Sequence, residues 1–570
     1  MQALSPILDQ PQTIDWSATQ ADPSYALANQ DLSFEVDAQT DLRNLFWPWA
    51  DEFYARSIRL RVSAPREDEL TPMVTRLYPG HQELILGTEG IIVSKRLAVP
   101  RQSDYDRAVL WLLDCQAEGD RLLRLEVTID WGEALTQRMV DGLLVAQRNP
   151  GPARGIYQQS NAELTCVFGN PQARPDSVNL DSPQHAHLVY HVLVNGMVEV
   201  PLLLALSDVG EQMAWSGFLA LRDPDRAFEL SAKAWASVLQ TGRLWTPDTN
   251  LNQALHAAKL AALRQVQRLR TGFAATDRQV IHTPALVNSI DGMDVTLSRN
   301  LLAHLRRLAE ASEGRLPTTV PVRSKEPILD PGAALLETNR AYLQALQQHL
   351  AHHWDAELLA AHYGAVQLCT EALIRVRIQQ SPLEVDMAST LHHALHLALT
   401  LAQWQQDEVN SVRWESEIRE VVRLVPAVAG HDAEQDDFLR DWPARTQWQP
   451  APDQPWRFGN VWGGIELAGQ TIWQGCGLAR QGDQWWVAPK WPAAWRWWAL
   501  VNLPLAAGAL TLVWDGTTLH STLPVQSALP VQQHEQIRVR GAGELDFDLH
   551  FEFQTDRADA TTRSIFRPEF

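Results

Sequence analysis

DPGAALLETNRAYLQALQQHLAHHWDAEL, residues 330–358, sets the architecture of the central part of the chain. Asp330 can cap the free amides at the start of a helix, and Pro331 at the first helical position gives up no hydrogen bond. Leucines then recur at helical spacing, and Asp355 caps a second helix. Because so short a loop joins two helices, the segment predicts an antiparallel helical hairpin.

The helical pattern extends to both sides of this hairpin. The sequence predicts a linking helix within 211–245 and further helices from residue 246 to about residue 430. Thr246-Pro247-Asp248 is a typical start signal, and Gly314 ends another helix. Because the connecting loops are short, we expect successive helices over 246–430 to form antiparallel hairpins.

Strand patterns flank the helices. Residues 123–131 alternate apolar and polar side chains, as a half-buried strand does, and residues 544–553 alternate in the same way. Asn195-Gly196 and Asp515-Gly516 each predict a hairpin turn. The predicted fold is therefore multidomain β + α: an N-terminal antiparallel β-sandwich over 1–210, the linking helix over 211–245, a central α/α-hairpin domain forming a partial toroid over 246–430, and a C-terminal Trp-rich β-sandwich over 431–570.

Composition excludes several classes of protein. Of the 570 residues, 45% are apolar and 20% are charged, which indicates a globular chain with a large core and excludes a disordered or fibrous one. The formal net charge is -20. Because such a surface repels phosphate backbones and anionic lipid, neither nucleic acid nor a membrane is expected as a partner.

The four cysteines, Cys115, Cys166, Cys369 and Cys476, are far apart in the sequence. They predict neither a zinc ribbon nor a disulfide framework, and no cofactor is expected. The first 30 residues lack the basic and then apolar pattern of a signal peptide, and no run of 18 apolar residues occurs. A cytoplasmic location is therefore expected.

Tryptophan is unusually frequent, with 23 residues against 8 tyrosines. Flat aromatic side chains stack on the apolar face of sugar rings, but tryptophan also fills β-rich cores, so both interpretations stay open. Trp47 and Trp49 in the segment Phe46-Trp47-Pro48-Trp49 illustrate the choice, because they either line a sugar site or pack in a core or domain contact.

The order of β domain, helical hairpins and β domain resembles the six-hairpin glycosidases, which include glucoamylase-like, debranching-like and rhamnosidase-like enzymes. In that family a catalytic (α/α)6 toroid lies between two β domains. The resemblance rests on Asp291-Gly292-Met293-Asp294 before a helix, on the hairpin over 330–358, and on Leu383-Glu384-Val385-Asp386 before another helix. Residues 487–514 are similar to the C-terminal sandwich of rhamnosidase-like enzymes. The resemblance implies a carbohydrate substrate.

An inverting hydrolase of this family needs two carboxyl groups about 6.5–9.5 Å apart, one as acid and one as base. By resemblance, Glu384 is the expected acid, with Asp386 as the nearby alternative. Glu384 could equally be a first-turn glutamate that the helix dipole favours. The resemblance also assigns Asp291 and Asp294 to sugar hydroxyls, although Asp294 could instead cap a helix, and Met293 replaces the usual arginine.

The helical region is short for a toroid of six hairpins. Residues 246–430 accommodate only about six or seven helices of ordinary length. No convincing base follows, and Asp432, Glu434 and Asp437 are the fallback candidates. An open half-toroid also exposes a concave helical face, which a neighbouring domain or a second subunit would cover.

Two functions follow from these observations. The first is inverting hydrolysis of an α-linked glucan or oligosaccharide. The second is a non-catalytic carbohydrate-binding or assembly protein that keeps the scaffold and lacks the base. His392 and His396 have the spacing of a metal pair, but no glutamate of the metalloprotease pattern lies between them, so no metal site is expected.

Overall fold

The computed structural model describes residues 12–15, 25–49, 52–64, 70–101, 105–148, 164–208, 210–322, 326–379, 382–426, 428, 438–449, 457–481, 484–492, 494–541 and 549–554. These residues belong to two compact units, one within Asp9–Ser237 and the other within Val238–Gln449 and Arg457–Phe570.

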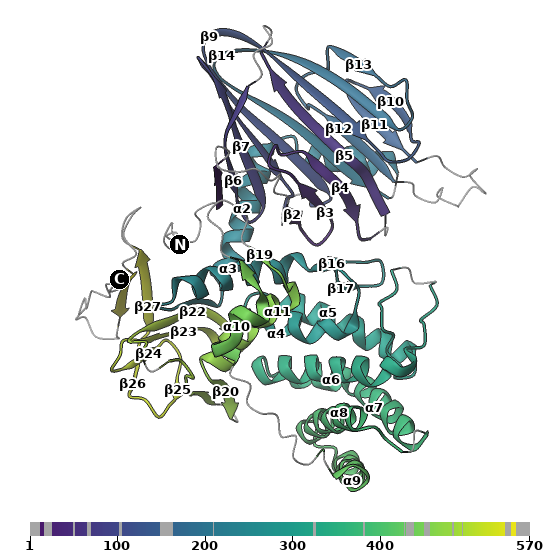
Figure 1. The fold of residues 1–570 in the computed structure, drawn as a ribbon, viewed down its shortest axis with the longest axis vertical. Helices are drawn as coiled ribbons and strands as arrows, with labels where there is room; N and C mark the ends of the chain where they lie inside the picture. Colours follow the sequence, from purple (N-terminus) through teal and green to yellow (C-terminus); the bar gives the residue numbers. More distant parts are fainter. Residues whose placement is uncertain are drawn as a thin grey trace. The chain divides into compact units, whose positions relative to one another are not determined.

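The first unit is built on a 14-stranded antiparallel sheet that doubles over into a sandwich (Figure 1). Its strands are β1 (Gln12–Asp15), β2 (Tyr25–Ala28), β3 (Ser33–Val36), β4 (Leu42–Trp47), β5 (Glu52–Ser63), β6 (Thr71–Leu77), β7 (His81–Thr88), β8 (Ile91–Ala98), β9 (Ala108–Asp130), β10 (Thr136–Val140), β11 (Leu143–Gln147), β12 (Thr165–Gly169), β13 (Ser177–Asn179) and β14 (His185–Ser207).

Two 23-residue strands, β9 and β14, belong to both layers of the sandwich. The first half of β9 pairs with β8 and its second half pairs with β5, while β14 pairs with β9 on both sides of an irregularity. Gly119 and Gly196 lie at that irregularity, with φ angles of 78° and 77°. The two layers are thus joined through continuous, locally distorted strands.

The prediction of a hairpin turn at Asn195-Gly196 is wrong, because the strand β14 continues through these two residues. The Asn195 side-chain amide donates to Oδ1 of Asp120 on β9 at 2.5 Å. A bulge and a tight turn both need a residue that accepts a positive φ, so an Asn-Gly pair satisfies either structure. The Asn-Gly pair thus correctly indicated a positive φ angle, but the structure that uses it is a bulge.

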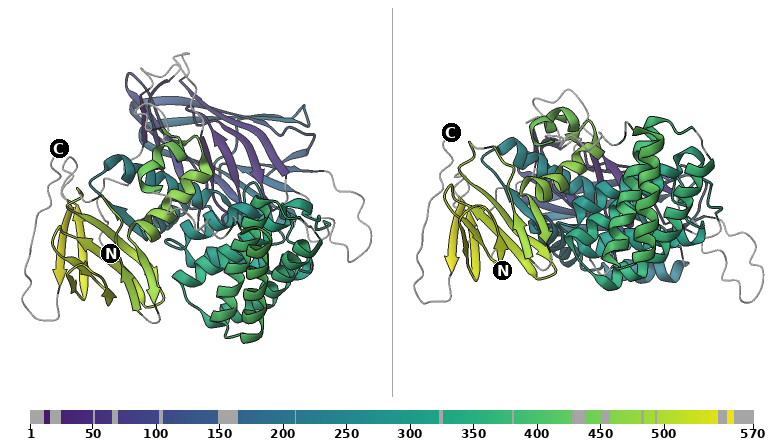
Figure 2. Two further views of the ribbon diagram at one scale, coloured as in Figure 1. Left: turned by 60° about the horizontal axis from the view of Figure 1, so that its bottom comes forward. Right: turned by 90° about the horizontal axis from the view of Figure 1, so that it is seen from below.

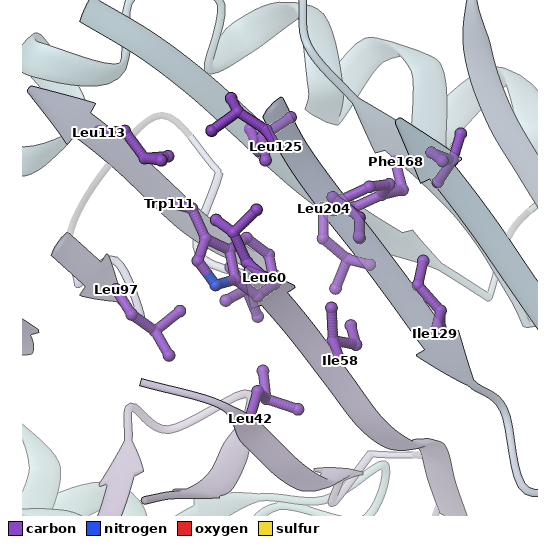
Figure 3. Packing of buried hydrophobic residues seen from close by; sticks show 14 of the residues in the cluster. Leu42, Ile58, Leu60, Leu97, Trp111, Leu113, Leu125, Ile129, Phe168 and Leu204 are labelled. Atoms are coloured by element: carbon purple, nitrogen blue, oxygen red, sulfur yellow. The ribbon is translucent and has the colours of Figure 1, made fainter. Parts of the chain in front are cut away.

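The core of the first unit lies between the layers, where the alternate apolar residues of the long strands meet. Figure 3 shows Leu125, Ile129 and Trp111 of β9 packed with side chains of other strands. Trp47 is fully buried in this cluster, whereas Trp49 packs against its edge. The core interpretation therefore holds for Trp47.

The segment predicted as one linking helix, 211–245, contains two helices and a strand: α1 (Glu211–Ala220), α2 (Pro224–Gln240) and β15 (Arg243–Trp245). α1 packs against β12 and β14. β15 pairs with β22 (Trp498–Leu505), so the chain joins a sheet of the second unit before the helices begin.

The helices of the second unit are α3 (Thr249–Arg264), α4 (Thr283–Ile290), α5 (Val295–Ala311), α6 (Leu335–His352), α7 (Ala356–Gln379), α8 (Val385–Trp404), α9 (Glu408–Leu424), α10 (Phe438–Thr446) and α11 (Val461–Gln470). A short 3-10 turn, Gly332–Ala334, separates Pro331 from α6. α10 and α11 lie in the range expected to hold only strands. None of the helices in the described part of the chain is long and apolar enough to cross a bilayer.

Helices α11, α4, α6 and α8 pack side by side in a row, and α5, α7 and α9 complete hairpins with α4, α6 and α8 (Figures 1 and 2). α4 and α6 run in the same direction, because Asp291 at the end of α4 contacts His349 near the end of α6, and α6 also packs on the turn Val280–His282 that precedes α4. α3 packs on α11 at one end of the row, and Figure 1 places α9 at the other end. The described helices therefore form an open row.

The remaining strands of the second unit form small sheets. They are β16 (Val266–Arg268), β17 (Phe273–Ala275), β18 (Trp448–Gln449), β19 (Arg457–Phe458), β20 (Leu478–Gln481), β21 (Gln484–Val487), β23 (Gly508–Trp514), β24 (Leu519–Ser521), β25 (Val525–Gln526), β26 (Val531–Gln533), β27 (Gln536–Gly541) and β28 (Leu549–Gln554). The hairpin predicted at Asp515-Gly516 is confirmed, because β23 and β24 pair antiparallel around it. Among the tryptophans described from residue 442 onward, five are buried and the others are half-buried or exposed; the buried ones are Trp442, Trp448, Trp473, Trp485 and Trp498.

Candidate functional site

The residues expected from the sequence lie at different places. Asp291 follows α4 and is fully buried, while Asp294 accepts a hydrogen bond from the Leu297 amide as the cap of α5. Glu384 precedes α8 and Asp386 lies in its first turn, both exposed. Trp47 and Trp49 belong to the first unit, where the Trp49 indole donates to Oδ2 of Asp208 at 2.7 Å.

The fallback bases Asp432, Glu434 and Asp437 lie outside the described residues. The structure brings Asp291 and Asp294 together at the end of α4, and it keeps Glu384 and Asp386 on another helix. α8 stands two helix spacings from α4, each about 8–10 Å. Asp291 and Glu384 therefore belong to separate places in the helical row.

Asp291 is the centre of a buried cluster at the carboxyl ends of α4 and α6. Nδ1 of His349 lies 2.7 Å from Oδ1 of Asp291, and Nδ1 of His352 lies 3.3 Å from Oδ2. Nε2 of His353 lies 3.0 Å from the Asp291 carbonyl oxygen. Because an ionised carboxylate and a carbonyl only accept, all three rings donate. Trp473 completes the cluster, with its ring stacked on His352 at 3.6 Å.

Charge within this cluster is strongly stabilised on the carboxylate. Burial alone would raise the pKa of Asp291, but attraction to His349 and hydrogen bonds from His349 and His352 outweigh it and hold that pKa far below its usual range. Burial lowers the pKa of His352 and lowers the pKa of His353 to about 4. Asp291 and His349 are 0% exposed, so the cluster joins two helices and has no room for a saccharide.

A second cluster lies at the opposite ends of the same helices, around the start of α4. Nδ1 of His282 lies 2.6 Å from Oδ2 of Asp277, and the other carboxylate oxygen of Asp277 accepts from the Gln279 amide at 3.0 Å. The His282 ring stacks on Trp462 at the start of α11, with centroids 4.0 Å apart and planes 21° apart. The His282 and Asp277 side chains are 26% and 35% exposed, so a ligand can reach them.

Glu466 lies one turn beyond Trp462 on α11 and adds a second carboxyl group to this cluster. Its side chain reaches the surface, yet crowding by protein atoms raises its pKa by desolvation, while the charges of Arg445 and His282 oppose that rise. A carboxylic acid that keeps its proton at higher pH suits proton donation. We call Asp277, His282, Trp462 and Glu466 the amino-end cluster.

Local structure explains how the amino-end cluster is held. Arg278 has a φ of 61°, which turns the chain sharply between Asp277 and α4, and Gln279 forms a β-bridge with Thr319. On the other side, the side chain of Asn460 caps α11 by accepting from the Gly463 amide at 3.1 Å. Gly464 lets α11 approach Phe458, because a Cβ there would lie 2.5 Å from that ring.

Sequence reasoning missed the amino-end cluster. Its two halves, 277–282 and 462–466, are separated by most of the helical region, and the second half lies in a range expected to form strands. The usable signals were the helix start Asn460-Val461-Trp462 and the Asp277 to His282 spacing. Neither indicates that α11 inserts next to α4.

The pair His392 and His396 lies exposed on α8, with their Nε2 atoms 3.3 Å apart. Across the described ranges, no group of three histidine, cysteine, aspartate or glutamate side chains is arranged to hold a metal ion. The described cysteines Cys115, Cys166, Cys369 and Cys476 are buried and form no disulfide with one another.

No protein-family model and no curated protein sequence matches the chain. Among solved structures it is similar to a candidate kojibiose phosphorylase from the human microbiome, with a TM-score of 0.57 and 8% identity over 90% of each chain. It is also similar to a GH78 family rhamnosidase of Bacillus sp. GL1, with a TM-score of 0.40, 11% identity and coverage of 77% of this chain and 55% of that one. It is similar as well to an α-L-rhamnosidase from Dictyoglumus thermophilum, with a TM-score of 0.40, 12% identity and coverage of 78% of this chain and 60% of that one. The first of these likenesses extends over nearly the whole chain and shows that the two proteins share a fold.

Proposed function

We propose that this chain cleaves glycosidic bonds of a saccharide at the amino-end cluster. The observation that carries the proposal is the combination of an oriented histidine, an aromatic ring and a carboxyl group of raised pKa at one partly exposed place. The fold shared with a carbohydrate-processing enzyme supports a saccharide as the substrate class.

In the proposed reaction Glu466 acts as the acid. Its protonated carboxyl group transfers a proton to the glycosidic oxygen as the bond between that oxygen and the anomeric carbon breaks. The desolvation that raises the pKa of Glu466 keeps this proton available nearer to neutral pH.

His282 acts as the base. When Nδ1 carries the hydrogen bonded to Asp277, Nε2 holds the lone pair, as in the catalytic arrangement where a carboxylate fixes the histidine tautomer. Nε2 accepts a proton from water while the water oxygen bonds to the anomeric carbon. Attack on the face opposite to the leaving oxygen inverts the configuration. An α-linked glucan or oligosaccharide is the proposed substrate, and Trp462 contributes aromatic contact to it.

The second candidate function is saccharide binding without turnover. It is favoured by the open row of helices, because the described residues contain three hairpins in it (α4–α5, α6–α7 and α8–α9), whereas a toroid of the resembled family has six. An assembly role, with a second copy of the chain against the row, belongs to this alternative. Glu384 also stays a prediction as the acid, although it stands on α8, away from α4.

The test compares Glu466→Gln with Glu384→Gln in the full chain, using a panel of aryl glycosides and oligosaccharides. We expect Glu466→Gln to lower kcat on oligosaccharides by about 10²–10⁴-fold and Glu384→Gln to leave it nearly unchanged. On aryl glycosides with an acidic phenol as leaving group, the loss in Glu466→Gln should be much smaller, because such a leaving group needs no proton. If Glu466 had only a structural role, Glu466→Gln would lower the rates on oligosaccharides and on aryl glycosides equally.

Three results would decide against this assignment. A loss confined to Glu384→Gln would move the acid to α8. Equal rates in both variants and the wild type would remove both residues from the chemistry. Binding of oligosaccharides by the wild type without any turnover would establish the second candidate function.

A further inference from the structure

A pocket of about 500 Å³ opens on the first unit, far along the sequence from the amino-end cluster. Its lining residues are Asn44, Phe53, Arg56, Trp131, Gly132, Glu133 and Arg148. Such a volume is within the usual range for small-molecule sites, about 300–1,000 Å³. All of the lining residues belong to the sandwich unit, so the pocket is complete without the helices.

Strand register gathers the pocket residues at one place. Arg43 pairs with Ser57, and Ser57 pairs with Asp130, so β4, β5 and the end of β9 lie next to one another. The register places Asn44 opposite Arg56, while Gly132 lies against Arg56, since a Cβ on it would be 3.5 Å from the Arg56 Cβ. Asn44 has a φ of 55°, which disturbs the regular strand at the pocket.

The apolar part of the pocket is an exposed aromatic ring. Phe53 is 60% exposed, and its ring rests against Phe46 with centroids 5.2 Å apart. A phenylalanine held this way presents a flat apolar surface to solvent at the edge of a pocket. The C–H face of a pyranose ring is an apolar surface of matching shape.

The polar part of the pocket offers donors that the protein itself does not use. Within the described ranges, the side chains of Arg56 and Asn44 make no hydrogen bond or ion pair, and both residues are exposed. Their N–H groups can therefore donate to acceptor oxygens of a ligand.

The pocket also contains an acceptor with a fixed position. Nε of Arg148 donates to Oε1 of Glu133 at 2.8 Å, and a second nitrogen of the same guanidinium donates to the same oxygen. Oε1 of Glu133 therefore accepts both hydrogen bonds from Arg148. Desolvation raises the pKa of Glu133 and lowers the pKa of Arg148, which indicates that the pair is shielded from bulk water.

We propose that this pocket is a second saccharide-binding site, separate from the proposed cleavage site. A pyranose ring stacks on Phe53, its hydroxyl groups accept from Arg56 and Asn44, and one hydroxyl donates to Glu133. Vicinal hydroxyl groups both donate and accept, as this set of side chains requires. The site involves no bond cleavage, and it would hold a polysaccharide near the protein.

The experiment measures binding of defined oligosaccharides to the full chain by calorimetry and saturation-transfer NMR. The probes are neutral gluco-, xylo- and manno-oligosaccharides and one glucuronate-containing xylo-oligosaccharide. Every protein carries Trp462→Ala, which weakens binding at the amino-end cluster and leaves the pocket intact. Phe53→Ala and Arg56→Gln are compared with Leu193→Ala and Arg61→Gln, which change an exposed apolar residue and an exposed arginine outside the pocket.

We expect at least one probe to bind and each pocket variant to weaken it by about tenfold or more, with both control variants close to the parent. Preference for the glucuronate probe that disappears in Arg56→Gln would identify an acidic sugar as the ligand. Unchanged affinity in both pocket variants, or no binding of any probe, would overturn the proposal. Turnover of short aryl glycosides by Phe53→Ala in the otherwise unmodified chain should equal that of the wild type, so failure of this proposal is distinguishable from failure of the proposed cleavage reaction.

Discussion

Nδ1 of His349 lies 2.7 Å from Oδ1 of Asp291, and both side chains are completely excluded from solvent. The two residues stand 58 positions apart in the sequence and join the carboxyl ends of α4 and α6. A buried pair of this kind is costly to break, because removing one partner leaves the other unpaired in the interior. This contact is therefore a structural link between neighbouring hairpins.

Asp291→Asn should lower the free energy of unfolding of the second unit by about 3–5 kcal/mol. Asp294→Ala, three residues further on, removes a half-buried helix cap and should cost about 1 kcal/mol. Urea unfolding followed by tryptophan fluorescence and circular dichroism measures both. Equal small losses in the two variants would contradict the structural role of Asp291.

Stability should fall as the pH drops from about 6.5 to about 4. Burial lowers the pKa values of His81, His304 and His353 to about 4, below the value of about 6.5 in an unfolded chain. In that interval the unfolded state binds protons that the folded state does not, so protonation favours unfolding as the pH decreases. The stabilisation is complete above about pH 6.5.

Thermal unfolding midpoints measured across this interval test the prediction. His304→Asn should flatten the dependence on pH, because it removes one of the groups that must be charged on unfolding. His396→Asn, which changes an exposed histidine, should leave the slope unchanged. A midpoint that stays constant between pH 6.5 and 4 in the wild type would rule out this linkage.

Substitution by alanine should change the stability of the protein in opposite directions at two glycines, Gly314, which lies against α7, and Gly364, which lies within α7. Gly314 has a φ of 80°, and a Cβ on it would lie 2.1 Å from the Leu368 carbonyl oxygen, so Gly314→Ala should destabilise by about 2 kcal/mol or more. Gly364 is exposed within α7 and has no heavy atom within 4 Å of the added Cβ.

Gly364→Ala should therefore stabilise the helix by about 0.5–1 kcal/mol, because alanine has the higher helix propensity. Chemical denaturation of the two variants beside the wild type gives both values. If Gly364→Ala were as harmful as Gly314→Ala, the assigned geometry of α7 would be incorrect.

Local signals in the sequence were sufficient where one short segment determines the structure. Asp248 caps α3 by accepting from the Leu251 amide, as its start signal predicted, and Asp515-Gly516 forms its hairpin. Asn195-Gly196 failed because its preference for positive φ is shared by turns and bulges. The choice between them depends on the partner strand β9, which a local pattern does not contain.

The candidate sites depend on contacts between distant segments. Asp291 was singled out by resemblance, but its partners come from the end of α6, where the sequence His349-Leu350-Ala351-His352-His353 gives no indication of what the rings face. The same holds for His282 and Trp462. Such pairings are decided by how helices pack, and the period of a helix does not specify its neighbour.

The insertion of α11 beside α3 and α4 has a consequence for how the protein is made. During synthesis on a ribosome, the helices from α4 to α9 emerge before α11. The surfaces of α3 and α4 that α11 covers therefore stay uncovered until residues 461–470 have been synthesised. The hairpins can stack as they emerge, but the junction of α3 with α4 closes only after nearly two hundred further residues have been synthesised. Folding of this unit is thus completed by a late, long-range contact. Until then, the nascent chain exposes the apolar surfaces of α3 and α4 that α11 later covers.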